Sequence, residues 1–376
     1  MIIVQIGPFP VNSNCIHGGV ESSVYGLAKE LAKTHTVDVF DLPRLSGKNI
    51  VEYIDGMTIH RYMNPGKHHK DSASIIPAII RDIVAIGPHV CHIHGTGTFS
   101  KEVKNALDEY GIRTIITVHG ILKIEKRNAL LKSPSIKTLY QFISQHDSEK
   151  SILKNSDIII VDTQYVADQI KAHYSVSTYL NVIPQGINQQ FAEIECSESS
   201  NIILSVGTFS RRKGHLFLLK SFEELCKDIS NIKLVIAGVV ADDSYYEELV
   251  RNLEKSEYKN NIQLMTNVSQ QQLFELYKNA HIFALHSEEE SQGIVFAEAM
   301  ATGLPVVATA VGGIPYVVTD HKTGLLSKYG DTRRFAANLK KMLGEISTWK
   351  EYSANAKIEA QRYLWNNIAN TVSNLY

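Results

Sequence analysis

Short β-branched runs alternate with segments of helical periodicity along the whole chain, and this alternation constrains the fold most. Strands are predicted at 2–6, 36–41, 58–62, 90–94, 114–119 and 158–162, and then at 202–206, 233–237, 262–265, 282–285, 306–308 and 324–327. Strand–helix–strand units of this kind build parallel sheets with helices on both faces. We therefore predict an α/β protein with two Rossmann-like, doubly wound domains.

The intervening helices have clear sequence signals. Over 19–34, Val24, Leu27 and Leu31 recur at the spacing that buries one helix face. A later helix is predicted to begin at Ser269, because Gln272 follows three residues on and completes a capping box.

The domain boundary is predicted where a short strand near Val182 meets Pro184 and Gly186. A length of 376 residues suits two domains, here 1–183 and 184–362. Ligands of such sheets bind at the carboxyl ends of the strands, so the site is expected to be shared by both halves.

Composition excludes several function classes. Lys plus Arg (38) nearly balance Asp plus Glu (39), so no nucleic-acid partner is expected. No apolar run reaches the roughly 18 residues that span a bilayer, and residues 1–11 lack the basic start of a signal peptide. Scattered cysteines without C-x-x-C argue against disulfides and zinc and favour the cytoplasm; they are Cys15, Cys91, Cys196 and Cys226.

The segment from His286 to Val306 holds the most informative motif. A strand ends at Leu285, a Gly-containing loop follows, and a helix is predicted from Ile294 to Gly303. Such a helix N-terminus favours a phosphate. Glu298 is suited to bind a ribose diol and Glu290 a second polyol, since a carboxylate accepts from two hydroxyls. The alternative is a solvated acidic loop with Glu298 favourably placed near a helix start.

Glu290-x(7)-Glu298 with Ala299-Met300-Ala301-x-Gly303-x-Pro305-Val306 resembles the signature of family 4 retaining glycosyltransferases. The resemblance implies the GT-B fold, in which two Rossmann-like domains face a central cleft. Trp365 resembles that family's C-terminal helix, so 363–376 is expected to cross back onto the first domain. Four further segments resemble the family in order: Gly18-Gly19-Val20-Glu21, His92-Ile93-His94-Gly95, Thr117-Val118-His119-Gly120, and Val206-Gly207 running to Lys213-Gly214.

The resemblance implies a role for each matching residue. Glu298 would bind the ribose hydroxyls and Glu290, as a positioning group, hydroxyls of the transferred sugar. Lys213 would bind phosphate, and His119 would lie beside the donor sugar near the reacting carbon. Without the resemblance, His119 could equally be a core histidine at a strand end whose hydrogen bonds are satisfied within the protein. The donor phosphates and sugar would also meet backbone groups of Gln292, Gly293 and Ile294 and of the Gly18-Gly19 loop. His119, Glu290 and Lys213 are the predicted catalytic set.

The sequence departs from the family pattern at three places. Thr208 stands where the family usually has a phosphate-binding Arg. We predict that Arg212 replaces that arginine, and Arg211 is the second candidate. The alternative is that Arg211 to Lys213 form a solvated basic turn. Gln185-Gly186-Ile187-Asn188 and Met265-Thr266 also differ from the family pattern and leave the nucleotide base open.

No metal or other cofactor is expected. The chain has no suitably placed Asp-x-Asp motif, and Asp242-Asp243 look like an ordinary loop. Cationic side chains and the helix N-terminus would then stabilise the leaving diphosphate, and activity should survive EDTA. His92 and His94 alternate on one strand and could share a face as ligands, but no third ligand is apparent.

The function implied is a retaining, metal-independent glycosyltransferase. Its donor would be a UDP-sugar first and a GDP-sugar second, and its acceptor a hydroxyl of a glycan or lipid-linked molecule in bacterial surface polysaccharide or lipopolysaccharide assembly. The alternative is a non-catalytic nucleotide-sugar-binding protein on the same scaffold. A phosphorylase would need a pyridoxal phosphate lysine that we cannot locate, and Gly18-Gly19 does not form the G-x-G-x-x-G of a dinucleotide oxidoreductase.

A basic amphipathic segment at 121–145 predicts a peripheral contact with the inner face of the cell membrane. It has one acidic residue, Glu125, and apolar residues lie between its cations. A solvated helix face over the acceptor cleft explains the pattern equally well. The cations are Lys123, Lys126, Arg127, Lys132 and Lys137.

Overall fold

The computed structural model describes residues 1–11, 18–42, 49–63, 74–132 and 135–376. Within them the chain forms two compact units. Unit 1 holds Met1–Val11, Gly18–Gln185 and Ile368–Tyr376, and unit 2 holds Gly186–Asn367. The C-terminal helix α14 (Trp365–Ser373) therefore contributes its first residues to unit 2 and the rest to unit 1.

Unit 1, as far as it is described, contains an eight-stranded sheet in the order β3-β4-β2-β1-β5-β6-β7-β8. Each neighbouring pair is parallel except β3 and β4, which form an antiparallel hairpin. Its elements are β1 Ile2–Gly7, α1 Gly19–Leu31, β2 Thr36–Asp41, β3 Ile50–Ile54, β4 Met57–Arg61, α2 Ile76–Ile86, β5 Val90–His94, α3 Thr98–Glu109, β6 Thr114–Val118, α4 Leu122–Lys132, α5 Ile136–Asn155, β7 Ile158–Val161, α6 Gln164–His173 and β8 Leu180–Val182.

Unit 2 contains a six-stranded parallel sheet, within the described residues, in the order β11-β10-β9-β12-β13-β14. Its elements are η2 Gln189–Glu193, β9 Ile202–Val206, η3 Arg211–Lys213, α7 His215–Cys226, β10 Lys233–Gly238, α8 Asp243–Glu254, η4 Lys259–Asn261, β11 Ile262–Thr266, α9 Gln270–Asn279, β12 Ile282–Leu285, α10 Ile294–Ala301, β13 Val306–Thr309, α11 Ile314–Val317, β14 Gly324–Ser327, α12 Thr332–Gly344, α13 Ile346–Ala360 and η5 Gln361–Tyr363.

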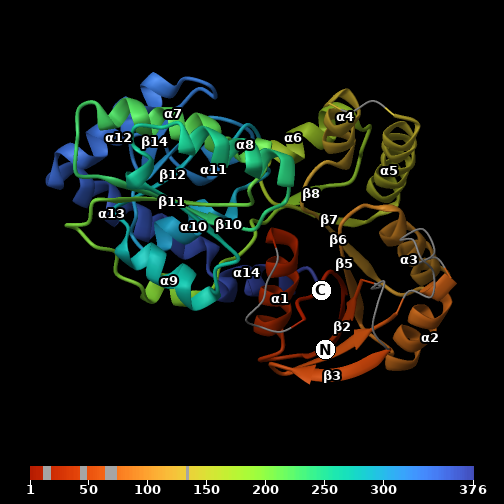
Figure 1. The fold of residues 1–376 in the computed structure, drawn as a ribbon. Coiled ribbons are helices and arrows are strands. Elements are labelled where there is room, and N and C mark those ends of the chain that lie inside the picture. The colour runs from red at the N-terminus through yellow and green to blue at the C-terminus, as the bar shows by residue number, and fades with distance from the viewer. Residues whose placement is uncertain (12–17, 43–48, 64–73, 133–134) are drawn as a thin grey trace. The chain divides into compact units, whose positions relative to one another are not determined.

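The sheet of unit 2 separates two hydrophobic cores, one on each face. Leu204 and Phe283 belong to one core, and their sequence neighbours Ile203 and Ile282 to the other. Alternate residues of a strand point to opposite faces, so a sheet covered on both sides is apolar throughout. Figure 1 shows α7, α8 and α12 on one side of this sheet and α9 and α10 on the other.

The structure confirms the predicted α/β class with two parallel-sheet, Rossmann-like domains. All twelve predicted strands are present, and their observed ends fall within one residue of the predicted ones. The capping box at Ser269 and Gln272 is confirmed as well. The predicted helix 19–34 is shorter, because α1 ends at Leu31. We missed β3, an edge strand whose exposed Val51 and Tyr53 give it no buried alternation.

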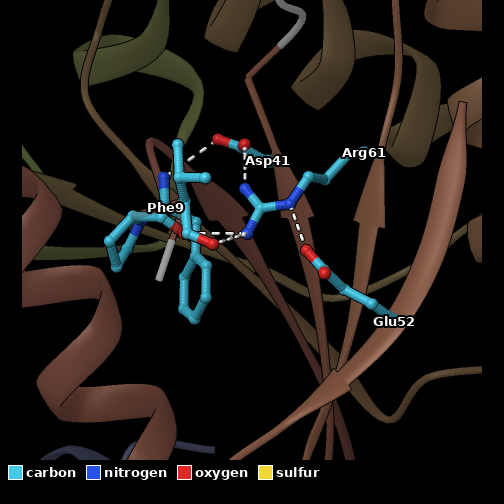
Figure 2. Close-up of polar contacts among 6 residues, drawn as sticks. Phe9, Asp41, Glu52 and Arg61 are labelled. Carbon is cyan, nitrogen blue, oxygen red and sulfur yellow. Dashed lines mark hydrogen bonds and ion pairs between the residues drawn. The ribbon is translucent and has the colours of Figure 1, made fainter. Parts of the chain in front are cut away.

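The chain leaving β1 is fixed by a buried arginine (Figure 2). Arg61 at the end of β4 donates from Nη1 to Asp41 Oδ2 at 2.6 Å and from Nη2 to the carbonyl of Pro10 at 2.8 Å. Its Nε pairs with Glu52 of β3. The Phe9 N–H donates to the other oxygen of Asp41 at 2.9 Å. This network holds the segment that leads from β1 toward Gly18, as far as residue 11.

Candidate active site

The candidate donor site of unit 2 lies at the carboxyl ends of β9 and β12. These adjacent strands are the point where the strand order reverses, since β10 and β11 extend one way and β13 and β14 the other. Ligands of doubly wound sheets bind at such a switch point. Lys213 lies in η3, in the loop after β9, and Glu290 lies in the loop after β12.

Lys213 and Glu290 form a buried ion pair. Lys213 Nζ donates to Glu290 Oε1 at 2.5 Å, and Ser287 Oγ donates to the same oxygen at 2.9 Å. Their side chains are only 11% and 6% exposed. Burial by itself would raise the pKa of Glu290, but the charges of Lys213 and Arg212 and the two hydrogen bonds hold it below its usual value. Glu290 is therefore an ionised acceptor inside the fold.

The two arginines before Lys213 have different surroundings. Arg211 donates to Glu248 of α8 at 2.6 Å, and its guanidinium lies 5.5 Å from the centre of the Tyr245 ring. Arg212 is exposed, and its charge lowers the pKa of Glu290. Of the two, Arg212 is the one whose charge acts on Glu290.

Helix α10 begins at Ile294 after Gly293, whose φ of 79° is left-handed and favours glycine. Gly293 offers no side chain to cap the first N–H groups of the helix, so these groups remain suited to an anion. Gln292 is buried just before it. The helix ends at Ala301, and Gly303 follows with a φ of 86°.

Glu298 receives a hydrogen bond from a residue that sequence analysis missed. Tyr277 of α9 is fully buried, and its hydroxyl donates to Glu298 Oε2 at 3.0 Å. Burial raises the pKa of Glu298 to about 7, and this hydrogen bond opposes the rise. Spacing could not connect the two, because Tyr277 belongs to another helix and resembles an ordinary core aromatic.

At the carboxyl ends of the strands in unit 2, glycines let the backbones of neighbouring loops pack against each other. A Cβ at Gly214 would lie 1.9 Å from the carbonyl oxygen of His286, and one at Gly313 would lie 1.8 Å from that of Ser291. The Gly313 N–H donates to the Glu290 carbonyl at 2.7 Å. The loop after β13 therefore supports the loop that contains Glu290, a role that sequence analysis did not assign.

In unit 1 the predicted glycines and His119 follow strands of the other sheet. Gly18 has a φ of 104° and precedes α1, which begins at Gly19. His119 follows β6, and its side chain is 6% exposed. Its Nε2 lies 3.1 Å from His94 Nδ1, and its Nδ1 lies 3.8 Å from Asp162 Oδ1. Both ring nitrogens thus face protein groups.

His92 and His94 do share a face, with ring centres 4.4 Å apart. Their nitrogens are hydrogen-bonded to protein: those of His92 to Tyr376 and Thr117, and those of His94 to His119 and Gln5. Among the described residues no group of three His, Cys, Asp or Glu could hold a metal ion. Cys15 lies outside the described residues.

The basic segment at 121–145 spans α4 and the first half of α5. Buried Glu149 accepts from the N–H groups of Leu122 and Lys123 at 2.9 and 3.0 Å and so caps α4. Arg127 and Lys137 are exposed. Residues 133–134 and the side chains at 125, 126 and 132 lie outside what is described. No helix in the described part of the chain is both long and apolar enough to cross a bilayer.

Two family models match the chain, one on each half. The model "Glycosyltransferase Family 4" matches residues 17–191, and the model "Glycosyl transferases group 1" matches residues 187–359. The protein is a glycosyltransferase. These matches favour the enzyme over a non-catalytic binding protein.

Curated relatives agree with this assignment. A D-inositol 3-phosphate glycosyltransferase of Corynebacterium diphtheriae is 24% identical over 408 residues, covering 100% of this chain and 93% of the relative. An N-acetyl-alpha-D-glucosaminyl L-malate synthase of Bacillus anthracis is 28% identical, covering 59% of this chain and 56% of the relative.

Solved structures of glycosyltransferases share the fold. Sucrose-phosphate synthase from Thermosynechococcus elongatus has a TM-score of 0.83 at 21% identity, with 100% of this chain and 98% of that chain covered. Anabaena HepE in complex with UDP-glucose has a TM-score of 0.76 at 15% identity, with 100% and 99% covered. The glycosyltransferase thus has the GT-B fold of these neighbours.

Proposed function

We propose that this glycosyltransferase moves a sugar from a UDP-sugar to a hydroxyl of a glycan or lipid-linked acceptor, with retention at the anomeric carbon. The observation that supports it most is the Lys213–Glu290 ion pair at the switch point of unit 2, with Glu298 on the adjoining helix. A UDP-sugar is favoured because the HepE structure holds UDP-glucose, and a GDP-sugar is the next candidate.

Each site residue has a proposed part in donor binding. Glu298, held by Tyr277, accepts from the ribose hydroxyls, and Glu290 accepts from hydroxyls of the sugar. Lys213 and Arg212 neutralise the diphosphate, together with the N–H groups at Gln292, Gly293 and Ile294. Gly18 and Gly19 allow close backbone approach to the phosphates, and His119 lies beside the sugar.

The proposed chemistry requires no metal. The bond between the anomeric carbon and the phosphate breaks through an oxocarbenium-like transition state. Negative charge then develops on the diphosphate, and Lys213, Arg212 and the start of α10 stabilise it. The acceptor hydroxyl oxygen attacks the anomeric carbon from the face that the diphosphate leaves. The departing phosphate oxygen takes the proton of that hydroxyl. Glu290 positions the sugar and is not the nucleophile.

An anionic membrane surface is the proposed location of the acceptor, reached from the cytoplasm during bacterial surface polysaccharide assembly. Ile136, Leu139, Tyr140 and Ile143 of α5 are 46–89% exposed and recur at i, i+3, i+4 and i+7, so they form one apolar helix face. Exposed Lys137 lies on the same helix and complements anionic lipid. Salt-sensitive co-sedimentation with phosphatidylglycerol vesicles supports this proposal, and its absence contradicts it.

The relatives point to a second acceptor class, a soluble phosphorylated polyol. The Corynebacterium diphtheriae relative is named for D-inositol 3-phosphate, and the structural neighbour is a sucrose-phosphate synthase. Turnover of UDP-glucose with inositol 3-phosphate or fructose 6-phosphate, without vesicles, would favour this class over a lipid-linked acceptor.

Calorimetric binding of UDP, GDP and ADP to the wild type and to Glu298→Ala tests the donor site. Charge-assisted hydrogen bonds contribute about 1.5 to 3 kcal/mol, so the variant should bind about tenfold or more weakly. If the wild type binds one of the three nucleotides and Glu298→Ala does not, the result identifies the base of the donor and supports the proposed site. Binding of none of the three contradicts the proposed function.

A further inference from the structure

Buried and half-buried polar side chains form a continuous row across unit 1, on the sheet face opposite Val4, Ile93 and the other core residues of that unit. The strand register places Gln5 beside His92, and His94 beside Thr117. Each member contacts the next, and the row runs through Gln185, Asp162, His119, His94, Gln5 and Tyr376.

The amide of Gln5 gives this row a direction. Its Nε2 donates to the Tyr376 hydroxyl at 2.9 Å, so its Oε1 faces His94 Nε2 at 2.6 Å. An amide oxygen only accepts. His94 Nε2 must therefore have the ring proton of His94.

The direction continues to His119. Burial lowers the pKa of His94 well below its usual value, so the ring is neutral and its Nδ1 has no proton. His119 Nε2, 3.1 Å from that atom, must then be the donor. Burial also lowers the pKa of His119 to about 4, so at neutral pH its remaining nitrogen, Nδ1, is unprotonated.

Asp162 faces this nitrogen. Gln185 Nε2 donates to Asp162 Oδ2 at 2.6 Å, which leaves Oδ1 toward His119 Nδ1 at 3.8 Å. Neither of these two facing atoms has a hydrogen-bond partner among the described residues. Burial raises the pKa of Asp162 to about 7, so near neutral pH this carboxyl can be protonated on Oδ1 while His119 Nδ1 has no proton.

We propose that Gln5 and His94 are positioning residues that fix the tautomer of His119, so that its ring donates from Nε2 and only accepts at Nδ1. The proposal rests on the proposed function, in which His119 lies beside the donor sugar. A substrate hydroxyl that reaches this ring must then donate to Nδ1, which has no hydrogen-bond partner among the described residues.

With the Gln5 amide in the opposite orientation, the donor and the acceptor of each hydrogen bond from Gln5 to His119 would be exchanged. His94 would then donate from Nδ1, and His119 would have its proton on Nδ1, toward ionised Asp162. Nitrogen NMR at neutral pH distinguishes a protonated from a bare ring nitrogen, and the His119 signals can be assigned with His119→Asn. We expect Nε2 protonated and Nδ1 bare, and a protonated Nδ1 would overturn the proposal without any variant of Gln5.

Gln5→Met tests the cause, because it keeps the side-chain length and removes both hydrogen bonds. We expect His119 to populate both tautomers, and kcat with UDP-glucose to fall about five- to tenfold with little change in KM. Thr117→Val is the matched control. It removes a buried hydrogen bond to His92 at 2.6 Å in the same network, but not on the path to His119, so the His119 signals should be those of the wild type.

The two readouts separate the failure of this proposal from that of the proposed function. Unchanged His119 signals in folded Gln5→Met would overturn the positioning role. If the tautomer of His119 is as expected but neither UDP-glucose nor GDP-mannose binds or is consumed, the proposed function fails. The role of Gln5 and His94 in positioning His119 for a donor sugar then fails with it. A kcat loss in Thr117→Val equal to that in Gln5→Met would also contradict the specific path through His94.

Discussion

Lys213 and Glu290 reach each other from the ends of adjacent strands, and their contact of 2.5 Å between Nζ and Oε1 joins two predicted catalytic residues. Each charge compensates the other inside the fold, where an unpaired charge is costly. A donor phosphate that draws Lys213 toward itself would free an oxygen of Glu290. We expect phosphate binding to prepare Glu290 in this way to accept from a sugar hydroxyl.

The ion pair should show strong coupling in a double-mutant cycle. Lys213→Met leaves Glu290 buried and unpaired, so the free energy of unfolding should fall by about 3 kcal/mol. Lys213→Met/Glu290→Leu should recover much of that loss, as measured by urea unfolding. Lys340→Ala is the control, because its pair with Asp228 is exposed and should contribute less than about 1 kcal/mol. Additive effects of the two site substitutions would refute the coupling.

Nucleotide affinity should rise with pH through the pKa of Glu298. Burial raises that pKa to about 7, so the carboxyl is protonated below this value and ionised above it. The ionised form accepts more hydrogen bonds from ribose, and UDP should bind more tightly at about pH 8 than at about pH 6. Glu298→Gln should abolish this part of the pH dependence in calorimetry. An identical profile in the variant would show that Glu298 is not responsible.

Tyr277→Phe should weaken UDP binding without unfolding the protein. The variant removes the hydroxyl that donates to Glu298, and one such bond is worth about 1 kcal/mol, or roughly fivefold in Kd. The pKa of Glu298 should also rise further, because the hydrogen bond lowers it. Tyr245→Phe is the matched control, since its buried hydroxyl accepts instead from the Leu216 N–H. Equal losses in the two variants would indicate a merely structural effect.

Gly313→Ala should disturb the loop of Glu290. The added Cβ would lie 1.8 Å from the Ser291 carbonyl oxygen, so the two loops must separate, which strains the hydrogen bond between Gly313 and Glu290. We expect a thermal midpoint several degrees lower and reduced turnover. Gly344→Ala is the control, because a Cβ there meets nothing within 4 Å. Wild-type behaviour of Gly313→Ala would show that the loops are not interlocked.

Turnover of the UDP-sugar should be unaffected by EDTA. In the proposed mechanism, Lys213, Arg212 and the start of α10 supply the positive potential that a divalent ion would otherwise give to the diphosphate. A loss of turnover that added Mg²⁺ or Mn²⁺ restores would contradict the metal-independent mechanism.

Periodicity and turn residues predicted most of the fold, because the buried strands are short apolar runs and many of the helices have an apolar face. They failed at β3, which, as far as the chain is described, pairs with β4 alone at the sheet edge and exposes Val51 and Tyr53. The motif located Glu290 and Glu298, since both lie close to the glycines that precede and follow helix α10. It could not reveal Tyr277 or Gln5, because these residues act through contacts made across 21 and 89 positions of the chain, with Glu298 and His94.

The glycine contacts of unit 2 limit how donor preference can be altered. Gly214, Gly312 and Gly313 each lie against a carbonyl oxygen of the loop after β12, so the three loops pack backbone to backbone at these points. Loop grafting from a relative with another donor would separate Lys213 from Glu290. Engineering of a new donor preference should therefore exchange single side chains at constant loop length.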